Sequence, residues 1–232
     1  MKQRSTRARL VALGAVAVLG LAACGGDDSA SEDTEAEEAT EEAVEETASG
    51  TGNDCTAGTT LTEGKLTIAT GNPAYEPWVV GDAPESKEGF EAAVAYGVAG
   101  ELGFSDENVV WVRTGFDEAI QPGAKNFDFN LQQFSITEER KATVSFSDPY
   151  YSTNQALVGF ADSAIAGATS VSELKDAKFG AQAGTTSLDF ITKVIQPTAE
   201  PFVYDDNAAA KAALEAKQID AIVVDLPTAF YI

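Results

Sequence analysis

The chain has 232 residues, with 37 Asp or Glu, 15 Lys or Arg and no His, and its formal net charge is −22. Such acidity argues against nucleic acid or an anionic membrane surface as a partner. The absence of histidine excludes an acid–base or metal site built on imidazole. No Ser/Lys pair or pair of carboxylates stands out either, so we expect no catalytic residue, no cofactor and no metal ion.

The first 24 residues are typical of an export signal. A basic start precedes an apolar run over residues 10–20, which is too short to span a bilayer comfortably. The sequence Leu-Ala-Ala-Cys that ends at Cys24 resembles the lipobox of bacterial lipoproteins. That resemblance implies removal of residues 1–23 and a lipid on Cys24 that anchors the protein to the outer face of the cell membrane. An ordinary signal peptide with a chance cysteine is the alternative.

An acidic segment follows, over residues 24–53. It contains eleven Asp and Glu and no Lys or Arg. A stretch with high charge and few apolar residues is predicted to be disordered and extended by repulsion. We interpret it as a lipidated, solvated linker, with a cation-binding acidic tail as the alternative.

From residue 54 onward, strand patterns alternate with helix patterns. We expect strands over 65–70, 109–113, 127–134, 155–160, 178–181, 201–204 and 219–224, and helices over 90–102, 116–120, 137–141, 171–174, 186–195 and 207–217. This alternation predicts an α/β fold with mostly parallel sheets. The pattern restarts after residue 160, so we expect two lobes, residues 54–154 and residues 155–232. Cys55 is either a free thiol or has a partner outside this sequence.

Several short motifs, in a fixed order along the chain, resemble those of a known protein family. The most specific are SITEERK at residues 135–141 and FSDPYY at 146–151, accompanied in order by YEPW at 75–78, EGFE at 88–91, GTT at 184–186 and IDAIVVD at 219–225. Together they resemble the extracellular solute-binding proteins, family 3, of ABC importers. The resemblance implies a two-lobed, type II periplasmic-binding-protein-like fold. Because family members continue into further closing elements, we expect the C-terminal part to be missing after Ile232.

The resemblance also implies a ligand site for an amino acid. Arg140 would hold the α-carboxylate with help from Ser135, Thr185 and Thr186, and Asp225 would hold the α-ammonium. Each has a plainer alternative role. Arg140 could be a surface cation paired with Glu138 or Asp148. Asp225 and the threonines could be helix N-caps, and for Asp225 the two roles are compatible.

Aromatic and amide residues are expected at the side-chain end of this site. Tyr75 and Trp78 would form the wall, with Phe116 beside them, although ordinary core packing is the commoner role for aromatic residues. Gln133 would help to choose the ligand. Because Asn72 stands where receptors for cationic amino acids often carry Asp, we expect an amide, hydroxyl or other neutral polar side chain on the ligand.

The function expected from the resemblance is that of a monomeric importer receptor. It would capture a polar amino acid and deliver it to the permease subunits of an ABC importer. A ligand-binding sensor for a membrane signalling partner is the main alternative, and a dehydratase-like enzyme on the same fold is a weaker one. The sequence leaves the identity of the amino acid open.

Overall fold

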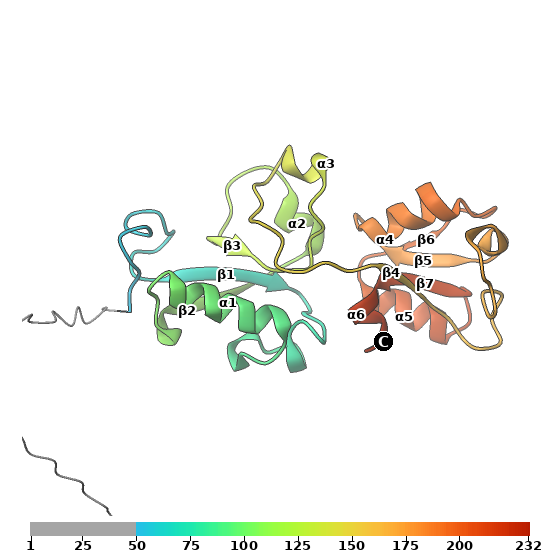
Figure 1. Ribbon diagram of the computed structural model, residues 1–232, viewed down its shortest axis with the longest axis horizontal. Helices are drawn as coiled ribbons and strands as arrows, with labels where there is room; N and C mark the ends of the chain where they lie inside the picture. The colour runs from blue at the N-terminus through green and yellow to red at the C-terminus, as the bar shows by residue number, and fades with distance from the viewer. Residues whose placement is uncertain (1–49) are drawn as a thin grey trace, which may run out of the picture. The chain divides into compact units, whose positions relative to one another are not determined.

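The computed structural model describes residues 50–232 (Figure 1). The export signal, Cys24 and the acidic segment up to residue 49 lie outside the described residues, so those expectations stay predictions. Gly52 and Asn53, placed by the sequence at the end of the linker, hydrogen-bond to the backbone of Gly103 and Leu102. In the described part, no helix is both long and apolar enough to cross a membrane. Below, lobe 1 denotes residues 50–154 and lobe 2 residues 155–232.

Lobe 1 is built on a three-stranded parallel sheet in the order β2-β1-β3. Its strands are β1 (Leu66–Gly71), β2 (Val109–Thr114) and β3 (Phe129–Asn130), and its α-helices are α1 (Phe90–Glu101), α2 (Phe116–Ile120) and α3 (Glu138–Lys141). Three 3-10 turns, Val80–Asp82, Pro84–Ser86 and Asp106–Asn108, complete it. Strand β3 is shorter than the expected 127–134: it ends at Asn130, and Gln133 farther along the chain has a φ of +52°, which is incompatible with an extended strand.

The core of lobe 1 lies between the sheet and α1. Leu66 and Ile68 of β1 pack against Ala95 and Ala99 of α1, and Phe104 closes the end of this cluster. The helix is confirmed, but its buried side is lined by alanines, whereas Phe90 and Val98 are each 39% exposed. Small side chains allow the helix axis to approach the sheet closely.

Lobe 2 contains a four-stranded sheet in the order β4-β7-β5-β6. The strands are β4 (Gln155–Val158), β5 (Phe179–Gln182), β6 (Phe202–Tyr204) and β7 (Ala221–Asp225), and β4 alone runs antiparallel to its neighbour. The helices are η4 (Val171–Leu174), α4 (Thr186–Asp189) with its π-helical continuation η5 (Phe190–Ile195), α5 (Asn207–Glu215) and α6 (Leu226–Ala229).

Strand β7 is buried on both faces, as its apolar sequence predicts. Ala221 and Val223 face the cluster formed with η5, whereas Ile222 and Val224 face the cluster formed with α5. Figure 1 shows α4 and α5 on opposite sides of this sheet. The predicted α/β fold with mostly parallel sheets is therefore confirmed. Asp225 is the last residue of β7 and lies at the carboxyl end of this buried strand.

Candidate functional site

A cavity of about 210 Å³ lies between residues of lobe 1 and residues of lobe 2. Most of its wall is polar. Seven of the predicted site residues are on it: Tyr75, Phe116, Gln133, Arg140, Thr185, Thr186 and Asp225. The described residues contain no group of His, Cys, Asp and Glu side chains that could hold a metal ion.

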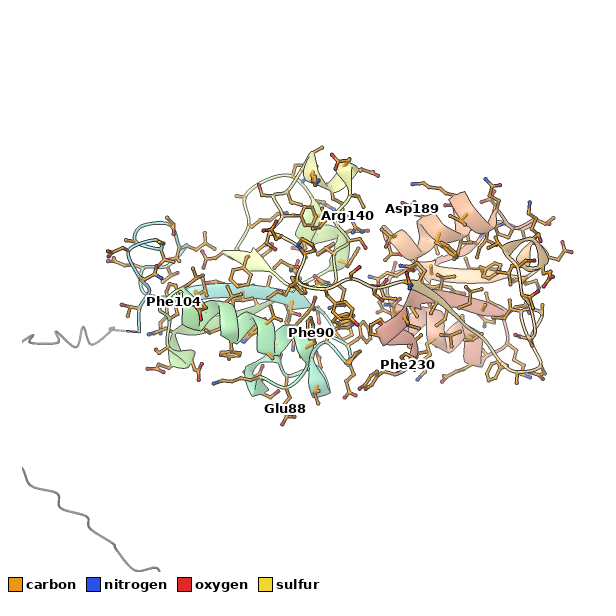
Figure 2. All side chains as sticks on the ribbon, in the orientation of Figure 1. Glu88, Phe90, Phe104, Arg140, Asp189 and Phe230 are labelled. Carbon is orange, nitrogen blue, oxygen red and sulfur yellow. The ribbon has the colours of Figure 1, made fainter. Side chains whose placement is uncertain are left out.

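Arg140 is buried although it carries a full charge, with only 7% of its surface exposed. Its place on α3 is fixed because Thr137 caps that helix and accepts a hydrogen bond from the Arg140 backbone N–H at 3.2 Å. The guanidinium carbon lies 5.4 Å from the ring centroid of Phe116 and 5.3 Å from that of Phe134, and the two rings stack. Figure 2 shows Arg140 among the side chains of lobe 1.

The polar partners of Arg140 come from both lobes. Its two terminal nitrogens donate to the carbonyl of Ser135 at 2.8 Å and to the carbonyl of Gly184 at 2.9 Å. Burial lowers the pKa of Arg140 below its ordinary value, and nearby carboxylates, Asp189 first among them, oppose this shift. Surface pairing with Glu138 or Asp148 is thus not the role of this side chain: Glu138 pairs with Lys141 instead.

The Gly-Thr-Thr turn after β5 meets lobe 1 at close range. Gly184 has a φ of +68°, and a Cβ at this position would overlap the carboxylate of Asp117 on α2. Thr185 caps α4: its hydroxyl donates to the Gln182 carbonyl at 2.7 Å and accepts from the Leu188 N–H at 3.2 Å. The capping alternative therefore describes the Thr185 hydroxyl, although the residue also lines the cavity.

Thr186 and Ser135 form a direct bridge between the lobes. Their hydroxyl oxygens lie 3.1 Å apart, within hydrogen-bond distance. Thr186 lines the cavity, whereas Ser135 lines a second, neighbouring hollow. The structure therefore places Ser135 behind Thr186 and Arg140, where it supports both, and not on the cavity wall.

Asp225 ends β7 and is half-buried. It stands at the N-cap position of α6, but its side chain makes no capping hydrogen bond. Instead, its Oδ1 accepts from the side-chain amide of Gln155 at 2.7 Å, and the Gln155 oxygen accepts from the Ser187 hydroxyl at 2.6 Å. Burial raises the pKa of Asp225, while the Gln155 hydrogen bond and the charge of Arg140 act in the opposite direction.

The aromatic predictions are only partly matched. Tyr75 and Phe116 line the cavity, and the Tyr75 hydroxyl is buried without a geometrically acceptable hydrogen bond. Trp78 is not on the cavity wall. It is 3% exposed, donates its indole N–H to the Thr228 hydroxyl at 3.0 Å and packs edge-on against Tyr151 with centroids 5.3 Å apart, which is the core-packing role.

Several lining residues were not expected from the sequence. Asp205 and Asp206 come from the connection between β6 and α5, and Gln182 is the last residue of β5. The position of Gln182 at the carboxyl end of a parallel strand was an available signal. The role of Gln155 was not readable, because it depends on the antiparallel pairing that places Gln155 directly opposite Asp225.

Comparison with known proteins gives a consistent result. The sequence model of the bacterial extracellular solute-binding proteins, family 3, matches residues 66–225. A glutamine-binding protein of Geobacillus stearothermophilus is 31% identical over 231 residues, which cover 97% of this chain and 83% of that protein. A putative ABC transporter arginine-binding protein 2 of Escherichia coli strain K12 is 30% identical over 154 residues, which cover 66% of this chain and 60% of that protein.

Solved structures show the same architecture. An ancestral arginine-binding protein bound to glutamine is 30% identical, with a TM-score of 0.61 and coverage of 73% of each chain. The ancestral amino acid-binding protein AncCDT-1, a precursor of cyclohexadienyl dehydratase, is 32% identical, with a TM-score of 0.60 over 72% of this chain and 73% of that one. The predicted type II periplasmic-binding-protein-like fold is thereby confirmed. The chain belongs to the bacterial extracellular solute-binding proteins, family 3.

Proposed function

We propose that this chain is the extracytoplasmic receptor of an ABC importer, which captures an α-amino acid with a polar side chain and delivers it to a membrane permease. The observation that carries the proposal is that the cation Arg140 and the carboxylate Asp225, at the carboxyl end of β7, both lie on the wall of the same cavity. An amino acid at neutral pH carries the two complementary charges. The names of the relatives, glutamine-binding and arginine-binding proteins, support this substrate class.

The α-carboxylate would bind at Arg140. A guanidinium has five N–H groups, and the carbonyls of Ser135 and Gly184 occupy two of them. The remaining N–H groups match the two oxygens of a carboxylate, and the guanidinium keeps its charge when it is desolvated. The Thr186 hydroxyl lies on the same wall and can donate to the same carboxylate. Because Gly184 and Thr186 belong to lobe 2 and Arg140 to lobe 1, this end of the ligand would join the two lobes.

The α-ammonium would bind at Asp225. The Gln155 amide already occupies Oδ1, which fixes the orientation of the carboxylate and leaves Oδ2 to accept from the ligand. Burial disfavours the charged carboxylate in the ligand-free protein, since it raises the pKa of Asp225. A bound ammonium group would compensate that cost, as a paired charge does in a low-dielectric site.

The side chain of the ligand would extend toward Asn72, Tyr75 and the acidic connection at Asp205 and Asp206, all of which line the cavity. Carboxylates and amide oxygens accept hydrogen bonds, so they favour a ligand side chain with N–H groups. An amide side chain meets this requirement and remains the expected type. Tyr75 would cover its apolar portion.

Lipidation of Cys24 would hold the receptor at the outer face of the cell membrane. Residues 24–49 would then act as a tether, and the importer would meet a monomeric receptor at the membrane surface. This part of the proposal is supported by the sequence alone, since Cys24 lies outside the described residues. Neither a cofactor nor nucleic acid is needed for any step.

A thermal-shift screen of the purified full chain against the common amino acids tests the proposal. A ligand at one hundred times its Kd stabilises the folded state by about 2.7 kcal/mol. For a domain of this size that corresponds to an increase in Tm of about 5–10 °C. We expect such a shift for at least one polar amino acid and none for its decarboxylated amine. The absence of a shift with every amino acid would contradict the proposal, and chemical conversion of the ligand would favour the dehydratase-like alternative.

A further inference from the structure

Glu91 is a buried carboxylate that the proposed ligand site does not use. It lies in the first turn of α1, within the EGFE motif, and is 1% exposed. Within the described residues, no Lys or Arg forms an ion pair with Glu91; the salt bridges found there all involve other carboxylates. A carboxylate this deeply buried needs hydrogen-bond donors to compensate its lost hydration.

Three neutral donors fill that need. Oε1 of Glu91 accepts from the backbone N–H of Gln133 at 2.8 Å and from the Tyr150 hydroxyl at 2.6 Å. Oε2 accepts from the side-chain amide nitrogen of Gln133. Two of the three bonds therefore converge on one residue, Gln133, which lines the candidate cavity.

Gln133 is held in an unusual conformation by these bonds. Its φ is +52°, a region that few residues other than glycine occupy without support. A carboxylate accepts hydrogen bonds but cannot donate them, so the nitrogen of the Gln133 carboxamide must face Glu91. The oxygen of the carboxamide then points away from Glu91. Among the hydrogen bonds of residues 50–232, none involves this oxygen, and it is not one of the buried atoms left without a partner.

We propose that Glu91 is a positioning residue that fixes the Gln133 carboxamide with its oxygen available to the ligand, so that the cavity selects side chains with an N–H donor. This inference rests on the proposed function and deepens it. Glu91 itself lines the neighbouring hollow and not the cavity, whereas Gln133 lies between the two and lines both. Glu91 acts through Gln133, and Tyr150 ties the same carboxylate to the start of the crossing from lobe 1 to lobe 2.

The substitution Glu91→Gln separates this role from simple structural support. The oxygen of the new amide is needed by the Gln133 N–H and the Tyr150 hydroxyl, so its NH₂ group replaces Oε2. Two NH₂ groups cannot bond to each other, and the Gln133 carboxamide must therefore turn over and present its NH₂ to the cavity. In this variant, ligands whose side chain carries a hydrogen-bond acceptor should bind more tightly, and ligands whose side chain carries a donor should bind more weakly.

Binding measured by titration calorimetry gives the first test. The probes are lysine, whose side chain only donates, methionine sulfoxide, whose side chain only accepts, and glutamine, which does both. Glu91→Gln should change the ratio of the lysine and methionine sulfoxide affinities by about tenfold, the value of one exchanged hydrogen bond. Glu88→Gln, three residues earlier and exposed, removes the same charge and should leave the ratio unchanged (Figure 2). In a Gln133→Leu background, Glu91→Gln should no longer alter the ratio. Equal weakening of all probes by Glu91→Gln would overturn the inference.

A second test needs no ligand and no stable Glu91 variant. In the ¹⁵N–¹H spectrum of the full chain, the side-chain amide of Gln133 is identified by its disappearance in Gln133→Leu. We expect one of its protons to resonate downfield of exposed glutamine amides, because it is bonded to a carboxylate. A resonance at the ordinary position would overturn the positioning role. If the wild type binds no amino acid, the proposed function fails while this spectrum still decides the role of Glu91.

Discussion

Replacing Asp225 with Asn should weaken ligand binding while leaving the ligand-free fold intact or slightly more stable. Asn has nearly the same shape as Asp and keeps an oxygen that can accept from the Gln155 amide at the observed 2.7 Å. The backbone position before α6 does not depend on the side chain, which makes no capping hydrogen bond. The substitution therefore removes the negative charge and little else.

The two expected effects have opposite signs. Burial raises the pKa of Asp225 in the ligand-free protein, which means that the fold disfavours its charged form, so neutral Asn relieves that cost. With ligand bound, the α-ammonium would lose its counter-charge. Removing one partner of a hydrogen-bonded, desolvated charge pair costs about 2–5 kcal/mol. Asp225 is only half-buried, so we expect the lower part of this range, a loss of affinity of about 30- to 300-fold.

Titration calorimetry on the wild type and on Asp225→Asn measures the affinity, and thermal unfolding without ligand measures the stability. Glu200→Gln is the matched control, because within residues 50–232 the exposed Glu200 side chain makes no hydrogen bond or ion pair, and its substitution removes one negative charge. Its affinity should equal that of the wild type. An affinity within a few-fold of wild type for Asp225→Asn would refute the assignment of the ammonium site. A large fall in the unfolding temperature would show that Asp225 is mainly structural.

Three further substitutions test separate parts of the account. Cys24→Ser should release the protein from membrane fractions or leave it unprocessed, and unchanged processing and fractionation would contradict lipidation. Gly184→Ala should lower ligand affinity by about tenfold or more, because its Cβ meets Asp117 at a positive φ; Gly167→Ala, with positive φ but open space, should not. Burial raises the pKa of Glu91 above its ordinary value of 4.5. The hydrogen bonds from Tyr150 and Gln133 lower this pKa, whereas the negative charge of Asp225 raises it further. The Glu91 carboxyl therefore binds a proton more readily in the folded chain than in the unfolded chain. Its contribution to the free energy of unfolding is fully present below pH 4.5 and is lost as the pH rises through the pKa of the folded state. Urea unfolding across the pH range should show a smaller decline in the free energy of unfolding for Glu91→Gln than for the wild type. The same pH dependence in both proteins would contradict this prediction.

The sequence was most informative where local chemistry determines structure. The helix over residues 116–120 and the turn over 171–174 have the predicted bounds, and β7 is buried on both faces as its apolar sequence requires. A helix over residues 90–102 was expected from the spacing of large apolar residues, and it forms over residues 90–101, yet its buried side consists of three alanines and Glu91. Hydrophobic spacing reports where a helix forms, but the depth of packing against the sheet decides which side is buried.

The candidate site was predictable where a motif carries it and not where tertiary contacts build it. Arg140, Asp225 and Thr186 were expected from their motifs, and the cavity brings them together. Trp78 packs in the core because its indole N–H bonds to Thr228, and Gln155 is oriented by its bond to Asp225; both partners lie far along the chain. No local pattern encodes such contacts, so these assignments needed the three-dimensional structure.

A crystal structure of the chain with its preferred amino acid bound tests the central claim most directly. We predict the α-carboxylate within hydrogen-bond distance of the Arg140 guanidinium and the Thr186 hydroxyl, and the α-ammonium within hydrogen-bond distance of Asp225. The ligand side chain should point toward Asn72 and Tyr75. A ligand bound in the reverse orientation, or in the neighbouring hollow lined by Trp78, would contradict the account.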